Sequence, residues 1–202
     1  MMKKLPVIFL MLFCATGLLR AGGPRFSFGL EWGYTATILK TSQHNYICSE
    51  GYRIIDNPVS WWYYSNGSVL ANAGLDLNDN INLSAYSGLL GVYSRRWVIP
   101  AELRIRWCPA GLSSDGWLIH GGAAATFPTS SLYETGFRAI AGGGYRLALS
   151  NTISVDFLVS LNFTLDSENI TDPDTRTLVP RSSITSNSTE YQAVNFSVAI
   201  NF

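Results

Sequence analysis

Both ends of the chain alternate apolar and polar side chains, and this period of two constrains the fold more than any other feature. Near the amino end, apolar residues occupy every second position from Phe26 to Ile38, and small, hydroxyl or acidic residues lie between them. Residues 194–202 alternate in the same way. Successive side chains of a strand point to opposite faces, so each segment predicts a β-strand with one apolar and one polar face.

The same pattern in the middle of the chain predicts further strands. No apolar run after residue 21 approaches the roughly 20 residues that a membrane-spanning helix needs. Short connections (78–80, 109–116 and 150–151) alternate with longer ones (40–67, 127–135 and 164–190), as in an up-and-down arrangement. Eight antiparallel strands are predicted over residues 26–38, 68–77, 81–92, 97–107, 117–126, 136–149, 152–163 and 194–202.

The composition indicates which face of these strands meets water. Hydrophobic residues make up 47% of the chain and charged residues only 14%, and Lys40 is the one lysine after residue 21. A soluble β-domain would need a well-charged exterior, so we expect the apolar face to meet lipid and the polar face to line a narrow lumen. The predicted fold is an all-β, eight-stranded antiparallel up-and-down transmembrane β-barrel over residues 22–202.

Residues 1–21 have the features of a cleaved signal peptide. Lys3 and Lys4 precede an apolar stretch, and Ala21 offers a small residue for cleavage. A lipoprotein anchored at Cys14 is the less favoured alternative, because Phe13 stands where a small residue is needed. The rest of the chain has 11 basic and 14 acidic side chains, and nothing in it suggests binding to nucleic acid.

The alternation of loop lengths predicts the orientation of the barrel. Short turns are expected at the periplasmic end and long loops outside, and an even number of strands then places both termini in the periplasm of a Gram-negative cell. Cys48 and Cys108 would lie at opposite ends of the barrel, so we expect two free thiols.

The last strand resembles a known family signal. Phe196, Val198, Ile200 and the terminal Phe202, preceded by Val194, resemble the carboxyl-terminal assembly signal of outer-membrane β-barrel proteins. The stretch 98–107 is similar to the middle strands of small opacity-type barrels. The resemblance to small OmpA-, OmpX- and opacity-like barrels implies residence in the bacterial outer membrane. It also implies periplasmic chaperones and the barrel-assembly machinery as partners during biogenesis.

Charged residues on the polar face are predicted to fill the lumen. An eight-stranded barrel is only wide enough for its own side chains, and a buried charge must be paired. We therefore expect a self-neutralising network rather than a pore, with Arg146 facing Asp156 and Arg104 facing His120. The predicted network consists of Glu31, Asp76, Glu102, Arg104, Arg106, His120, Arg138, Arg146 and Asp156.

Tryptophans give an independent check of the strand length. Trp97 and Trp107 are ten residues apart on one predicted strand. At about 3.3 Å per residue and a tilt of about 40°, this separation spans roughly 25 Å, the height of a lipid-facing band. We expect these residues, with Trp117, to belong to aromatic girdles at the two membrane interfaces.

No catalytic, metal or cofactor site is predicted. The two histidines, His44 and His120, lack a sequence partner that would activate a nucleophile. A lipid-A-modifying barrel enzyme, of the deacylase or palmitoyltransferase kind, is kept as the alternative function, and a narrow pore as a further one.

Two surface features suggest contacts outside the cell. Lys40, Arg95 and Arg96 fall at the predicted outer rim, where guanidinium groups could bind lipopolysaccharide phosphates. The aromatic run Trp61, Trp62, Tyr63 and Tyr64 falls in the first predicted outer loop, where it could anchor an interaction. The sequence therefore favours a structural or interaction protein of the outer membrane, free-standing or bound to an envelope protein partner.

Overall fold

The computed structural model describes residues 25–93, 96–130 and 134–202. The predicted signal peptide and Arg95 lie outside these ranges. The elements are β1 (Arg25–Ile47), β2 (Arg53–Asp56), β3 (Val59–Asp76), β4 (Ile81–Tyr93), β5 (Arg96–Trp107), β6 (Gly116–Pro128), β7 (Gly136–Ala148), β8 (Ser154–Asp166), the short 3₁₀ helix η1 (Arg181–Ser183) and β9 (Ile184–Asn201).

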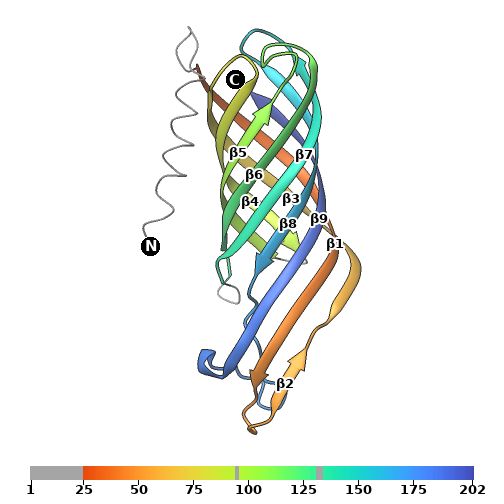
Figure 1. Cartoon of the computed structure of the whole chain (residues 1–202), viewed down its shortest axis with the longest axis vertical. Helices are drawn as coiled ribbons and strands as arrows, with labels where there is room; N and C mark the ends of the chain where they lie inside the picture. The colour runs from red at the N-terminus through yellow and green to blue at the C-terminus, as the bar shows by residue number, and fades with distance from the viewer. Residues whose placement is uncertain (1–24, 94–95, 131–133) are drawn as a thin grey trace, which may run out of the picture.

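Eight of these strands close into a ring (Figure 1). Each pairs with its neighbours in the order β1–β3–β4–β5–β6–β7–β8–β9, and β9 pairs back to β1, with every pairing antiparallel. Within the described residues, β2 is a ninth strand that pairs only with β1, outside the ring. The predicted all-β, eight-stranded up-and-down barrel is confirmed.

The two faces of the wall differ as the alternation predicts. Phe28 and Leu103 are 58% and 62% exposed on the outside, and Val198 on β9 is half-buried. Strand β5 alternates strictly, with every even-numbered residue from Arg96 to Arg106 buried and every odd-numbered one exposed. The buried polar side chains therefore face the interior of the ring, and the exposed apolar side chains form its outer wall. None of the described helices is long and apolar enough to cross a membrane.

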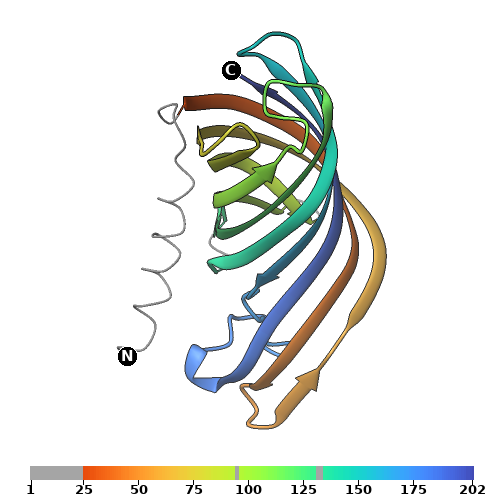
Figure 2. The ribbon, with the colours of Figure 1, turned by 45° about the horizontal axis from the view of Figure 1, so that its top comes forward.

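Strands β1, β3 and β9 continue well beyond the ring, and together with β2 they form a part that we call the extension (Figures 1 and 2). Strand β1 reaches Ile47 and pairs there with β2 and β9, far from the end of the barrel at which Arg25 and Phe202 lie, the termini end. The prediction of a loop is wrong over most of 40–67, which contains the end of β1, β2 and the first part of β3. It is wrong only at the two ends of 164–190, which contain the last residues of β8 and the first part of β9. The apolar–polar alternation is lost in these segments, since residues 40–45 and 185–190 are all polar and residues 61–64 are all aromatic, yet backbone pairing continues through them.

A β-bulge at Ile38 changes which residues of β1 point inward. The register with both neighbouring strands shifts between Thr37 and Leu39. Before the bulge the odd-numbered residues are buried, as at Thr37, whereas beyond it Ser42 and Tyr46 are buried. One extra residue reverses the alternation of a strand. Lys40 therefore turns towards the interior side of the wall.

A cover segment, residues 167–183, lies against the inner side of the extension. Ile170 and Val179 pack with Tyr46 and Cys48 in a small apolar cluster. Cys108 lies at the termini end, after β5, so the two cysteines are at opposite ends and both are free, as predicted. The short turns predicted at 78–80, 109–116 and 150–151 all lie at the termini end.

Candidate functional site in the barrel lumen

A chain of ion pairs crosses the middle of the lumen. Arg104 Nη1 lies 2.7 Å from Glu31 Oε2, and Arg104 Nη2 lies 2.6 Å from Glu102 Oε1. Arg138 pairs with the other oxygen of Glu102 and donates to Asn162 Oδ1 at 2.8 Å. The four charged side chains are 1–2% exposed. This central network links β1, β5, β7 and β8, so it fills the lumen from wall to wall.

A second set of ion pairs surrounds Asp156 nearer the termini end. Arg146 Nε donates to Asp156 Oδ1 at 2.7 Å and Arg146 Nη2 to Oδ2 at 2.9 Å. Arg106 Nη1 lies 2.9 Å from Asp156 Oδ2, and Asn201 donates to the same oxygen at 3.0 Å. The predicted pairing of Arg146 with Asp156 is confirmed. Asp76 instead accepts a hydrogen bond from Asn82 at 2.8 Å.

The predicted pairing of Arg104 with His120 is wrong. In the β5–β6 register Arg104 faces Gly122, and Arg106 faces His120. The pairing is displaced by two residues from the expected one, which leaves every side chain on its predicted face. The turn between these strands is held by bonds that the alternation does not show, including one from Asn80 Nδ2 to the carbonyl oxygen of Cys108 at 2.8 Å.

His120 has a hydroxyl partner that the sequence analysis did not find. Its Nε2 lies 3.1 Å from Ser160 Oγ, and both residues are buried in the lumen. Gly142 lies between them, and a Cβ there would approach His120 Nε2 to 2.9 Å. The bare backbone at Gly142 is the sequence signal for this close approach. His44 contacts Asn187 Oδ1 at 3.2 Å in the extension, far along β1.

A third charged group, the outer cluster, lies where the ring meets the extension. Arg96 is 1% exposed, forms an ion pair with Asp166 and donates to Tyr191 Oη at 2.9 Å. Lys40 Nζ lies 2.8 Å from Glu168 Oε1 in the cover segment. The expected position of Lys40 and Arg96 at an exposed rim is therefore wrong, because both are turned inward and already paired.

Glu168 holds the cover segment to the barrel. Besides Lys40, the hydroxyl of Tyr191 donates to this carboxylate. Burial alone would raise the pKa of Glu168, but the hydrogen bonds from Lys40 and Tyr191 lower it below its ordinary value. The contact therefore favours the charged carboxylate, and the segment is fastened by an ion pair.

The tryptophans predicted for the girdles lie on the outer wall. Trp97 and Trp107 are exposed at opposite ends of β5, and Trp117 is 74% exposed at the start of β6, with its ring edge against Tyr145. In the predicted assembly signal, Phe196 on β9 and Phe202 just after it are exposed, whereas Val198 and Ile200 are half-buried.

The aromatic run of the predicted first outer loop lies on β3 instead. Trp61 is 72% exposed, whereas the ring of Tyr64 packs against Tyr93 with centroids 4.4 Å apart. The side chains of Trp62 and Tyr63 lie outside the described residues, although their backbone belongs to the strand. Only part of the run is therefore open to a partner.

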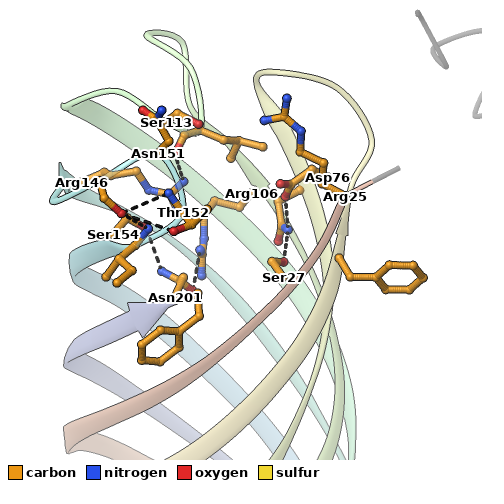
Figure 3. A pocket seen from close by; sticks show the side chains of 16 residues that line it. Arg25, Ser27, Asp76, Arg106, Ser113, Arg146, Asn151, Thr152, Ser154 and Asn201 are labelled. Carbon is orange, nitrogen blue, oxygen red and sulfur yellow. Dashed lines mark hydrogen bonds between the residues drawn. The ribbon is translucent and has the colours of Figure 1, made fainter. Parts of the chain in front are cut away.

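A polar cavity of about 400 Å³, the mouth cavity, opens at the termini end (Figure 3). It lies directly against the Asp156 ion pairs, since Arg106 and Arg146 form part of its wall. Among the described residues no group of three or more His, Cys, Asp or Glu side chains that could hold a metal ion occurs. The cavity is lined by Arg25, Phe26, Ser27, Asp76, Asn82, Arg106, Leu112, Ser113, Arg146, Ser150, Asn151, Thr152, Ile153, Ser154, Asn201 and Phe202.

Comparison with known proteins gives structural likenesses only. No family model and no curated protein matches the sequence. The structure is similar to that of the outer membrane protein OprG from Pseudomonas aeruginosa, with a TM-score of 0.48 and 12% identity over 90% of this chain and 98% of that one. It is also similar to the InvG secretin-domain β-barrel of the Salmonella SPI-1 injectisome, with a TM-score of 0.25 and 12% identity over 97% and 66%. At this level of similarity neither structure assigns an activity to this chain.

Proposed function

We propose that this chain is an integral outer-membrane β-barrel protein with a closed lumen, whose extension binds a protein partner through an open strand edge. The observation that carries the proposal is the division of the molecule into two parts. The ring is apolar outside and ion-paired inside, whereas the extension presents unpaired backbone and exposed aromatic groups.

The outer wall supports a position in the lipid bilayer. Large apolar side chains such as Phe28, Leu103, Leu161 and Phe196 are about half exposed or more around the ring. This apolar surface is far larger than the apolar patches that ordinary soluble proteins expose to water. A closed strand ring with an apolar exterior satisfies every backbone group of its wall and suits hydrocarbon.

The central network supports a closed lumen rather than a pore. Glu31, Arg104, Glu102 and Arg138 join opposite walls at a level where each is almost fully buried. Opening a path for ions would separate these pairs and leave several charges without partners, at a cost of several kcal/mol for each. The barrel then serves as a membrane anchor for the parts outside it.

The extension supports a role in binding. Pairing of β3 with β4 begins at Ser68, so none of the described residues pairs with the β4 side of β3 from Val59 to Tyr64. Figures 1 and 2 show this part of β3, with β2, along one border of the extension. Free edges invite strand addition unless charges or proline block them, and residues 59–64 contain neither.

These features suit an extended protein segment as the partner. Main-chain hydrogen bonds to the open edge would provide affinity, and alternate side chains would provide selectivity. Trp61 and Val59 are exposed on the same face of β3 and could anchor an apolar residue of that segment. The edge carries no charge, so the partner segment is expected to be uncharged where it pairs.

Amide hydrogen exchange on the purified protein tests this proposal. In detergent micelles, outward amides of residues 59–64 should exchange quickly, and a detergent extract of the envelope should slow them at least tenfold. Trp61→Pro, which removes a backbone donor on the open side of β3 and disfavours strand addition, should abolish the protection, whereas Ser186→Pro on β9 should leave it unchanged. Unchanged exchange with the extract would refute the proposal. Protection by purified lipopolysaccharide alone would replace the protein partner with a lipid surface.

A further inference from the structure

The outer wall carries an apolar groove at the end of the ring that adjoins the extension. The groove has a volume of about 530 Å³, and ligand sites usually span roughly 300–1,000 Å³. Trp61 on β3 lies at one side of it and Ala139 and Ala141 on β7 lie at the other, with residues of β1, β9 and β8 between them. The groove therefore crosses the border between the extension and the ring.

The strand registers place this groove on the outer face of the wall. Leu39 is paired with Trp61 on one side and with Gln192 on the other, and Gln192 is paired in turn with Phe163. Directly paired residues of antiparallel strands share one face of the sheet, and Trp61 and Gln192 are both exposed. Leu161, which lies beside this row on β8, is 67% exposed. The groove therefore opens to the medium around the barrel, which for an outer-membrane barrel is lipid.

The β-bulge in β1 and two small side chains on β7 account for the hollow. The extra residue of the bulge makes two successive residues, Ile38 and Leu39, line the groove, and a bulged strand bends. Figure 2 shows β1 curving as it passes from the ring into the extension. Ala139 and Ala141 each raise only a methyl group above the sheet, whereas Leu161, the partner of Ala141, stands well above it.

The position of the groove indicates hydrocarbon as its occupant. It is continuous with the apolar outer wall, on which Phe137, Leu161 and Phe196 are exposed around it. An empty hollow would forfeit van der Waals contacts of the side chains that line it, so an acyl chain of a neighbouring lipid would enter it. A chain in a groove contacts protein on several sides, whereas a chain on a convex wall contacts it on one. Such a chain should remain bound when bulk lipid is removed.

The polar end of the groove indicates the headgroup of this lipid. Gln192 lines the groove, and its Nε2 donates to Oε1 of Glu190 at 2.6 Å on the same face of β9. Glu190 is partly exposed, and within the described residues its carboxylate forms no ion pair. Lys40, Arg96 and Arg181 are each paired with another acid. A carboxylate without a cation attracts an ammonium group and repels a phosphate.

We infer that the groove binds one acyl chain of a glycerophospholipid with an ethanolamine headgroup, whose ammonium group pairs with Glu190. The inference rests on the membrane position proposed above, but it is independent of the partner proposed for the strand edge. The hydrogen-bonding groups of that edge lie in the plane of the sheet, whereas the groove lies on its outer face.

Native mass spectrometry of the full barrel tests the inference. The barrel is inserted into vesicles of equal parts dioleoyl phosphatidylethanolamine, dioleoyl phosphatidylglycerol and lipid A, and is then extracted into a mild detergent. We expect one retained phosphatidylethanolamine for each barrel, and at least fivefold less of either other lipid. The two phospholipids share their acyl chains and phosphate, so a preference between them reports the ammonium group. Failure to insert would refute the membrane position and the inference together, whereas an inserted barrel that retains no lipid, or retains all three equally, would refute the inference alone.

Two pairs of matched variants complete the test, with circular dichroism as the check of folding. Ala141→Trp fills the groove and should reduce the retained lipid at least tenfold, whereas Ala85→Trp, also exposed on the outer wall but on β4 outside the groove, should leave it unchanged. Glu190→Gln should remove the preference for the ethanolamine lipid, whereas Glu50→Gln, exposed in the turn after β1, should keep it. Equal retention by the two tryptophan variants, or an unchanged preference in Glu190→Gln, would overturn the inference.

Discussion

Replacing Glu102 by glutamine tests whether the central network holds the lumen closed. Glu102 Oε1 accepts from Arg104 Nε at 2.7 Å, and its other oxygen pairs with Arg138. Glutamine has nearly the same shape but no charge. Its amide NH2 group would point a hydrogen-bond donor at a guanidinium group, which has only donors itself. The network then carries two cations and the single carboxylate of Glu31.

The structure sets the size of the expected effect. Both arginines and Glu102 are at most 2% exposed, so water cannot replace the lost charge. Removing one partner of a buried ion pair costs about 3–5 kcal/mol, because an uncompensated charge remains. At about 1.36 kcal/mol for each factor of ten, the ratio of folded to unfolded protein should fall roughly 150- to 5,000-fold.

Equilibrium urea unfolding in phospholipid vesicles, followed by tryptophan fluorescence, measures this loss. Asp76→Asn is the matched control, since Asp76 is half-buried and bonds to the neutral Asn82; it should cost less than about 1 kcal/mol. The double variant Glu102→Gln/Arg138→Met restores neutrality and should recover part of the loss. If Glu102→Gln were no less stable than Asp76→Asn, or the double variant were weaker still, the ion-paired plug would be refuted.

The remaining predictions concern the outer wall and the cover segment. Leu103→Arg should destabilise the barrel in vesicles by about 2–4 kcal/mol if this face meets hydrocarbon, whereas Leu178→Arg, exposed in the cover segment, should have little effect on urea unfolding. Because the pKa of Glu168 is lowered in the folded state, its contact with Lys40 contributes stability above the unfolded value of about 4.3 and loses it as pH falls through the folded value. Proteolysis within 167–183 should therefore accelerate at acid pH, and Lys40→Met should accelerate it already at pH 7.

The strands of the ring and their faces could be predicted because the alternation of apolar and polar residues directly reflects which side of the wall each side chain faces. Each wall residue from Trp97 to Trp107 meets either the outer medium or the lumen, so its side chain reports its direction without knowledge of its neighbours. The charged residues assigned to the lumen lie inside for this reason. The short turns could be predicted as well, since polar residues such as Asn78 bond to their own turn, with Asn78 Oδ1 accepting from the backbone of Ile81 at 2.8 Å.

The extension could not be predicted, because its two faces do not differ in polarity. Around Ser42 and Gln43 both faces of β1 carry polar groups, and the inner face is covered by a segment more than a hundred residues later in the chain. The bulge at Ile38 leaves no mark in the composition either, yet it turns Lys40 inward. Arg96 differs from both. Its parity matches Arg104 and Arg106, so the alternation points it inward, but the predicted strand began at Trp97 and left Arg96 in the connection at the rim, whereas β5 begins at Arg96.

Which charged residues pair across the lumen depends on the register between the strands, which no local sequence pattern contains. The partner of Glu31 on the far wall is fixed by the accumulated register of every hairpin and by the closure of β9 on β1. A displacement of two residues in one hairpin preserves all inside and outside assignments, but it exchanges Arg104 for Arg106 opposite His120. Whether a side chain points inward or outward can therefore be predicted from the sequence, whereas the choice of ion-pair partners depends on the whole ring. A substitution that shifts one register by two residues should preserve the apolar wall and still break the network.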